Sequence, residues 1–221
     1  MKFEAILFDC DGVLVDSEPL TNGVLRDMLQ ELGWQLTAAQ CMSLFLGKAL
    51  KDEAALIAQH TGAPVTEHWL AAFRERRNVA LTAHVTAIPN IHAAVQRIHA
   101  AHAGRIACAS GADRFKVELM LRKLALYGYF EDRIFSGHET PRSKPFPDVY
   151  LAAAAALAVD PTRCAVIEDT VTGVQAGVAA GATVFAYAPG DGAPVDAMAL
   201  RQAGAHHLFA DMAFLPGLLA S

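Results

Sequence analysis

The chain has 221 residues, of which 53% are hydrophobic and 19% are charged, and its formal net charge is −5. A chain this rich in apolar residues can bury a core, which excludes an intrinsically disordered protein. The mild acidity argues against nucleic acid as a partner, because nucleic-acid-binding domains usually carry a basic face. The length fits one or two domains.

The N-terminal apolar run is interrupted by Glu4 and Asp9, which does not fit a secretion signal. The charge-free segment 170–190 is as long as a membrane span, but a break near Gly181 favours a buried helix followed by a strand. The four cysteines are widely spaced, which favours reduced, buried thiols. We therefore expect a cytoplasmic protein without a membrane partner, and we take a monomer as the default.

The first predicted element is a short apolar run over residues 5–8, followed by turn residues that end in Gly12. Such a run predicts a buried parallel strand. Apolar residues at helical spacing follow, with no strand among them, over 18–32, 37–46, 50–60 and 67–80. The sequence therefore predicts a helical cap domain over 17–82, inserted into a core domain formed by 1–16 and 83–221.

Strand-like and helical segments alternate after residue 83. Strands are predicted over 105–109, 134–136, 164–167, 183–186 and 207–209, and helices over 113–126, 148–157 and 171–180. This alternation predicts a parallel sheet with helices on both faces. The expected fold class is α/β, with a Rossmann-like parallel sheet core and a helical cap insertion. Gly173, Gly177 and Gly181 recur every four residues, which predicts a helix packed closely on the sheet.

Polar residues follow three of the predicted strands. In an open α/β sheet, ligands bind at the carboxyl ends of the strands, so these residues should converge on one rim. A lysine before a proline-rich helix start completes the set, which comprises Asp9, Asp11, Ser110, Gly111, Lys144, Glu168 and Asp169.

The acidic members of this set indicate a site for a cation. Asp9 and Asp11 are two residues apart as the chain leaves a strand, so both side chains can reach the same side. Together with Glu168 and Asp169 they offer only oxygen ligands, which favours a hard ion such as Mg²⁺.

The remaining members suit a phosphate group. The Ser110 hydroxyl, nearby backbone N–H groups and the Lys144 ammonium group would hold phosphate oxygens. A carboxylate can attack phosphorus to give an acyl phosphate, and a second one can serve as general acid and then as general base. The predicted partner is a small phosphorylated metabolite.

Four segments resemble, in order and spacing, the four motifs of the haloacid dehalogenase-like hydrolase superfamily. They are FDCDGVLVDSE over 8–18, ASG over 109–111, SKPFPD over 143–148 and IEDTVTG over 167–173. The first motif and the helical insertion after it resemble the branch that contains β-phosphoglucomutase and small-molecule phosphatases. Residues 135–145 are also similar to bacterial phosphatases of sugar acids such as 6-phosphogluconate.

The resemblance implies a role for each matching residue. Asp9 would be the nucleophile and a Mg²⁺ ligand, and Asp11 would be the acid/base and lend its backbone carbonyl to the metal. Asp169 would bind Mg²⁺, and Glu168 would either bind it too or order its surroundings. Ser110, with Gly111 beside it, and Lys144 would bind the phosphoryl group. Dehalogenases and phosphonate-cleaving members lack an aspartate at the position of Asp11, which disfavours both activities.

Three functions use residues of these types. A Mg²⁺-dependent phosphatase of a sugar or sugar-acid phosphate fits all four motifs. A β-phosphoglucomutase-like mutase is the alternative, since Lys48 and Arg77-Asn78 suit its cap, although such mutases usually have a histidine where this chain has Thr21. A receiver-type signalling module also uses acidic residues, a Ser/Thr and a lysine, but the helical insertion and Asp11 argue against it.

Overall fold

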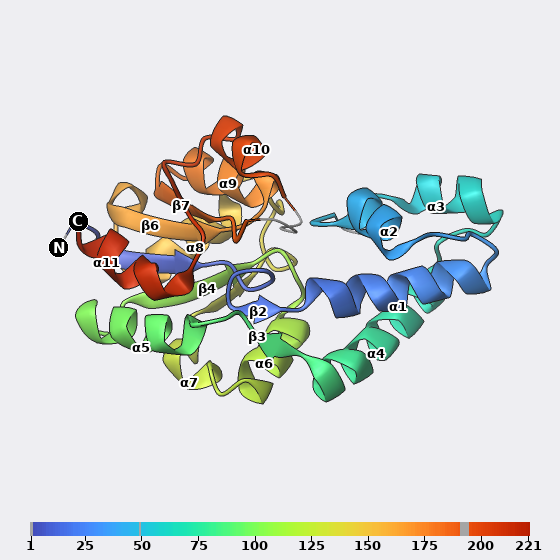
Figure 1. Ribbon diagram of the computed structural model, residues 1–221, viewed down its shortest axis with the longest axis horizontal. Helices are drawn as coiled ribbons and strands as arrows, with labels where there is room; N and C mark the ends of the chain where they lie inside the picture. The colour runs from blue at the N-terminus through green and yellow to red at the C-terminus, as the bar shows by residue number, and fades with distance from the viewer. Residues whose placement is uncertain (1, 49, 191–194) are drawn as a thin grey trace. The chain divides into compact units, whose positions relative to one another are not determined.

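The structure, a computed structural model, describes residues 2–48, 50–190 and 195–221 (Figure 1). The chain divides into two compact units, one formed by Met1–Asp16 with Thr86–Ser221 and the other by Ser17–Val85. Residues 83–85, which the sequence assigned to the core, fall in the second unit. The reason is that helix α4 (Glu67–His84) continues four residues beyond its predicted end at residue 80.

The first unit contains a six-stranded sheet with the strand order β5-β4-β1-β6-β7-β8. Every neighbouring pair is parallel, and β1 aligns Ile6 with Ile106 on one side and with Ala165 on the other. These strands confirm the predicted α/β fold with a parallel sheet. They are β1 (Ala5–Phe8), β4 (Ile106–Ser110), β5 (Ile134–Ser136), β6 (Cys164–Glu168), β7 (Thr183–Tyr187) and β8 (His207–Phe209).

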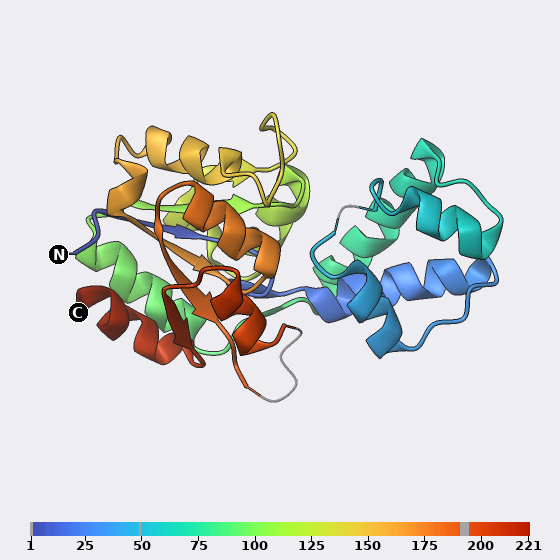
Figure 2. The same cartoon turned by 90° about the horizontal axis from the view of Figure 1, so that it is seen from above.

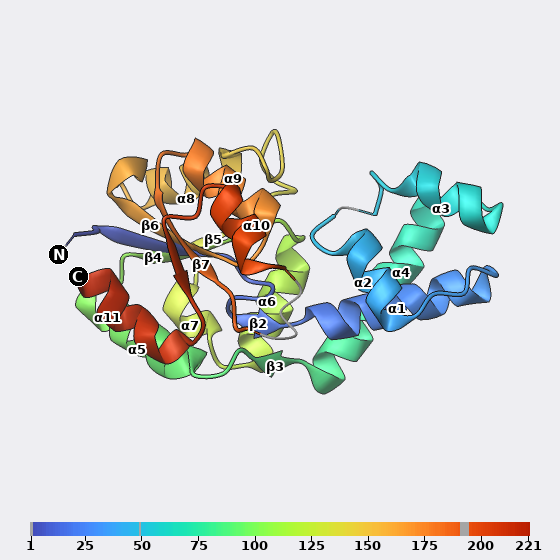
Figure 3. The ribbon, with the colours of Figure 1, turned by 45° about the horizontal axis from the view of Figure 1, so that its top comes forward.

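Helices cover both faces of this sheet (Figure 3). One face carries α8 (Asp148–Ala156), α9 (Val171–Ala179) and α10 (Ala197–Gln202). The other carries α5 (Ile91–Ala101), α6 (Arg114–Lys123), α7 (Tyr127–Phe130) and α11 (Leu215–Ala220). The C-terminal α11 packs beside α5 (Figure 2). Because both faces are covered, every residue of β1, β4 and β6 is buried, which explains their continuous apolar runs.

The second unit consists of the helices α1 (Glu18–Glu31), α2 (Ala38–Phe45), α3 (Ala54–Thr61) and α4. The start of α2 is fixed by a capping box, in which the side chains of Thr37 and Gln40 each bond the other's backbone N–H. The unit has a core of its own, made by the buried residues Leu25, Met28, Leu29, Cys41, Phe45, Ile57 and Phe73.

Two short strands lie where the chain leaves and re-enters the first unit. β2 (Val15–Asp16) pairs antiparallel with β3 (Thr86–Ala87), with Val15 opposite Ala87. The sequence did not predict them, because two residues are too few to show a period of two. Helix α5 was also missed, although Ile91, Val95 and Ile98 are buried at helical spacing.

The charge-free segment folds as predicted, as helix α9 followed by strand β7. Within the part of the chain that the structure describes, none of the helices is long and apolar enough to cross a membrane. The cysteines are also as predicted, because all four are buried free thiols.

Candidate active site

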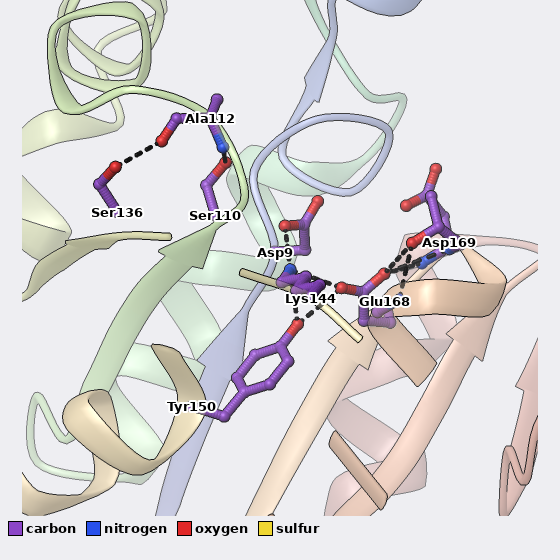
Figure 4. Close-up of polar contacts among 10 residues, drawn as sticks. Asp9, Ser110, Ala112, Ser136, Lys144, Tyr150, Glu168 and Asp169 are labelled. Carbon is purple, nitrogen blue, oxygen red and sulfur yellow. Dashed lines mark hydrogen bonds and ion pairs between the residues drawn. The ribbon is translucent and has the colours of Figure 1, made fainter. Parts of the chain in front are cut away.

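The predicted site residues lie at the carboxyl ends of three neighbouring strands (Figure 4). Asp9 follows β1 directly, Ser110 is the last residue of β4, and Glu168 is the last residue of β6. Since β1 lies between β4 and β6, Asp9 stands between the other two side chains. The strand order thus places the three groups at the edge where ligands of open α/β sheets bind.

Lys144 joins the acidic residues from the loop between β5 and α8. Its Nζ lies 2.6 Å from Asp9 Oδ1 and 2.6 Å from Glu168 Oε1, and its side chain is only 8% exposed. Burial by itself would lower the pKa of Lys144, but attraction to the two carboxylates outweighs it and raises that pKa well above its ordinary value. Lys144 is therefore a fixed positive charge between Asp9 and Glu168.

Glu168 is fully buried and is held by donors on both carboxylate oxygens. Oε1 accepts from Lys144 Nζ and from the Tyr150 hydroxyl at 2.7 Å. Oε2 accepts from the backbone N–H groups of Asp169 and Thr170 and from the Thr170 hydroxyl. Burial would raise the pKa of Glu168, but Lys144 and these hydrogen bonds outweigh it and keep the pKa below its usual value.

Asp9 is buried near two other carboxyl groups, those of Glu168 and Asp11, and near the ammonium group of Lys144. Its burial, together with Glu168 and Asp11, raises its pKa to about 7, although Lys144 acts in the opposite direction. Lys144 thus does not offset burial and the neighbouring carboxylates together, and an additional cation would favour the charged form of Asp9.

Asp9, Glu168 and Asp169 offer carboxylate oxygens that all lie within 4.8 Å of one another. This separation, the surplus of negative charge and the all-oxygen donor set fit a bound metal ion. The cluster is therefore able to hold a metal.

Two glycines allow the close approach of these carboxylates. Gly12 has a φ of +77°, and a Cβ built on it would overlap the Asp169 carboxylate. A Cβ on Gly173, in the first turn of α9, would overlap the Glu168 carboxylate. Any larger residue at either position would displace an acidic group of the cluster.

Asp11 has a different partner from the other acidic residues. It follows β1 by three positions, in a turn closed by hydrogen bonds from Gly12 N to Val15 O and from Leu14 N to Cys10 O. The Asp11 Oδ1 atom lies 2.7 Å from Nζ of Lys116, which comes from helix α6.

Ser110 and Gly111 lie on the opposite side of Asp9 from Glu168, since β4 and β6 flank β1. The Ser110 Oγ accepts a hydrogen bond from the Ala112 N–H at 3.0 Å, and its side chain is buried. Gly111 is exposed. The Ser136 hydroxyl fixes the same turn by donating to the Ala112 carbonyl (Figure 4).

The structure thus links Asp9, Lys144, Glu168 and Asp169 through direct contacts, and it places Ser110 on the adjacent strand end. Sequence reasoning missed two residues of this region, Tyr150 and Lys116. Both lie on buried faces of helices, where a single sequence gives no signal that separates a contact with the site from ordinary packing.

Comparison with known proteins identifies the family. The family of haloacid dehalogenase-like hydrolases matches residues 3–181, most of the chain. The chain belongs to this family. The match includes the strand ends and the loop that carry Asp9, Ser110, Lys144 and Glu168.

Two curated relatives from Escherichia coli are phosphatases. This hydrolase is 30% identical over 190 residues to 6-phosphogluconate phosphatase, a match that covers 84% of this chain and 83% of the relative. It is 29% identical over 181 residues to a fructose-1-phosphate phosphatase, covering 81% and 94% of the two chains. These relatives place this hydrolase among the phosphatases of the family.

A solved structure supports the assignment to the family. A hydrolase of this family from Deinococcus radiodurans is 36% identical and superimposes with a TM-score of 0.79, over 99% of this chain and 96% of that one. That structure was solved with bound phosphate and sodium.

Proposed function

We propose that this hydrolase is a Mg²⁺-dependent phosphatase of a small sugar or sugar-acid phosphate, and that it works through a phospho-aspartate on Asp9. The observation that carries the proposal is the position of Asp9, buried at the end of the central strand with Lys144 2.6 Å away and two further carboxylates beside it. The substrate class comes from the names of the relatives, which act on 6-phosphogluconate and fructose 1-phosphate.

In the first step, an Asp9 oxygen attacks phosphorus. A bond forms between Asp9 and phosphorus, and the bond from phosphorus to the substrate's alcohol oxygen breaks. Asp11 gives its proton to the leaving oxygen as general acid. Lys144 stays charged throughout and stabilises the negative charge that spreads over the phosphoryl oxygens.

In the second step, water attacks the phosphorus of the phospho-aspartate. Asp11, now a carboxylate, takes a proton from that water, the bond to Asp9 breaks and inorganic phosphate leaves. Both Asp9 and Asp11 return to their starting states, so no other reactant is needed.

The phosphoryl group would be held from the side of β4. The Ser110 Oγ accepts from the Ala112 N–H, which leaves the hydroxyl proton for a phosphoryl oxygen. The backbone N–H of exposed Gly111 would add a second donor, and Lys144 a third.

We assign Asp9, Asp169 and the backbone carbonyl of Asp11 as the groups that would hold Mg²⁺. Glu168 would order this set rather than bind the ion, because its two oxygens already accept five hydrogen bonds from Lys144, Tyr150, Asp169 and Thr170. When bound, Mg²⁺ supplies positive charge toward the phosphoryl oxygens.

We also assign the helical unit Ser17–Val85 as a cap that excludes water and selects the leaving group. It is inserted between β2 and β3, six residues after Asp11. Lys48, Arg77 and Asn78 are its candidate specificity residues. Arg77 and Asn78 orient each other, since the Arg77 guanidinium donates two hydrogen bonds to Asn78 Oδ1.

The test is an assay of the purified protein with Mg²⁺ and a panel of 6-phosphogluconate, fructose 1-phosphate, a hexitol phosphate and β-glucose 1-phosphate. Free phosphate is measured by colorimetry and sugar phosphate isomers by ³¹P NMR. We expect phosphate release from at least one sugar phosphate, and loss of nearly all of it on addition of EDTA or in Asp9→Asn. Asp132→Asn is the matched control, because Asp132 lies on the surface with its side chain 92% exposed.

Each other result contradicts a part of the proposal. Isomer formation without phosphate release would replace the phosphatase with a mutase. Unchanged turnover in Asp9→Asn would exclude the phospho-aspartate, and unchanged turnover in EDTA would exclude the metal. No turnover of any phosphate ester, with stable labelling of Asp9, would indicate a signalling role.

A further inference from the structure

Lys116 forms an ion pair with Asp11 inside the first unit. The distance between Lys116 Nζ and Asp11 Oδ1 is 2.7 Å, and the two side chains are only 6% and 15% exposed. A pair this shielded from water is weakly screened by salt and holds its geometry better than a surface pair. The contact therefore restrains the Asp11 side chain.

The lysine itself is well anchored. Lys116 lies in the first turn of α6, where its backbone N–H donates to the side chain of the capping residue Asp113 at 2.9 Å. The next turn of the helix buries Val117 and Met120 against the core. The start of α6 is thus a rigid support, and it fixes where the ammonium group can reach.

Two lysines pair with three of the four acidic residues of the site. Lys144 is paired with Asp9 and Glu168, whereas Lys116 is paired with Asp11. Asp11 follows Asp9 by two residues, and without Lys116 the like charge of Asp9 would repel it.

We propose that Lys116 is a positioning residue for the acid/base Asp11, holding its carboxyl group at the place from which a proton reaches the leaving oxygen. This inference rests on the proposed phosphatase function. Lys116 has no contact with phosphorus in this role. It acts only through Asp11: the ammonium group holds Oδ1, so that Oδ2 carries the proton that Asp11 gives to the leaving alcohol and later takes from the attacking water.

The role can be tested by changing the leaving group. Loss of p-nitrophenolate needs no proton, whereas loss of a sugar alkoxide does, so only the sugar phosphate needs the acid in the first step. Because kcat/KM reports the reaction up to transfer of the phosphoryl group to Asp9, it isolates that step. The water attack of the second step needs Asp11 for both substrates.

We expect Lys116→Met to lower kcat/KM for the preferred sugar phosphate of the panel by about tenfold to a hundredfold, since proton transfer by a positioned side chain contributes about 10²–10⁴. The kcat/KM for p-nitrophenyl phosphate should change by less than about twofold. Its kcat should fall if water attack on the phospho-aspartate limits turnover. Lys116→Arg should restore part of the loss, because it keeps the positive charge.

Two controls keep the result specific. Lys123→Met is the same substitution on an exposed residue of the same helix and should match the wild type. In an Asp11→Asn background, Lys116→Met should cause no further loss, because its effect passes through Asp11. Thermal melting of each variant shows whether it is folded.

The outcomes separate this inference from the proposed function. A wild type that hydrolyses neither substrate contradicts the phosphatase. If the wild type is active, two results contradict the positioning role. One is an equal loss of kcat/KM for both substrates in a folded Lys116→Met, and the other is a further loss when Lys116→Met is added to Asp11→Asn. In the last case Lys116 would instead bind the substrate directly.

Discussion

At the scale of single residues, the Tyr150 hydroxyl bonds to both Lys144 and Glu168. It accepts a hydrogen bond from Lys144 Nζ at 2.9 Å and donates one to Glu168 Oε1 at 2.7 Å. Burial and the neighbouring Glu168 raise the pKa of Tyr150 well above its usual value, so the hydroxyl keeps its proton and remains a donor. Tyr150 therefore restrains Lys144 without changing the charge of the site.

Replacement of Tyr150 by phenylalanine should weaken the site without disturbing the fold. The ring stays, so the packing of this fully buried residue is kept. Each lost hydrogen bond to a charged group is worth about 1.5–3 kcal/mol, but Lys144 and Glu168 still bond to each other, so we expect a loss of about 2 kcal/mol in the free energy of unfolding.

Turnover of Tyr150→Phe should fall about threefold to tenfold, because Lys144 is less firmly held against the phosphoryl group. Steady-state kinetics and urea unfolding measure both effects. The half-exposed Tyr127 provides the control, and Tyr127→Phe should leave turnover unchanged. Wild-type turnover in Tyr150→Phe would mean that the hydroxyl only satisfies buried charges.

At the scale of elements, α9 shows how glycine spacing determines packing. A Cβ on Gly177 would lie 2.8 Å from Val184 Cγ2 of β7 and 3.1 Å from Val166 Cγ1 of β6. This confirms the close helix–sheet packing that the glycine repeat predicts. The other two glycines serve different purposes, because Gly173 makes room for the Glu168 carboxylate and Gly181 follows the helix with a φ of +85°.

The same substitution should therefore have opposite effects in two helices. Alanine is favoured over glycine in a helix by about 1 kcal/mol, so Gly23→Ala in α1, where the added Cβ meets nothing within 4 Å, should stabilise the protein. Gly177→Ala should destabilise it by about 1–3 kcal/mol, because the overlap with two valines costs more than the helix gains. Chemical unfolding of the two variants makes the comparison, and a stabilised Gly177→Ala would show that β6 and β7 can shift.

The strands were predicted more successfully than the helix ends. The central strands β1, β4 and β6 are largely apolar runs with both faces buried, which leaves a clear signal. The helix predicted over 113–126 ends instead at Lys123, since Ala125 adopts a φ of +56° that nothing in its sequence indicates. Helix α3 begins at Ala54 instead of residue 50.

At the scale of the whole molecule, the two units have separate hydrophobic cores. The core on one face of the sheet includes Val166 and Leu200, while that of the helical unit includes Leu29 and Phe73. Among the residues that the structure describes, none belongs to both of these clusters. Each unit should therefore be destabilised by substitutions in its own core.

Leu29→Ala tests this expectation. A buried leucine replaced by alanine costs about 2–5 kcal/mol, so amide hydrogen exchange should accelerate through α1 to α4 and remain at wild-type rates in the sheet. Leu200→Ala in α10 is the matched control and should show the reverse pattern. Mass spectrometry of peptides from each unit measures both, and faster exchange across the whole chain in either variant would show that the units unfold together.

The parallel sheet, the helical insertion and the residue types of the site could be predicted from the sequence, because apolar periodicity and turn residues are local signals. The four motif segments also indicated the family. The polar contacts of the site depend on the tertiary structure. Lys144 pairs with Asp9 and Glu168, the Tyr150 hydroxyl bonds to Lys144 and Glu168, and Lys116 pairs with Asp11. These pairs join positions 6 to 135 residues apart, and several of them cross from one element to another. Their choice of partner depends on strand order and on helix rotation, which no single segment of the chain encodes.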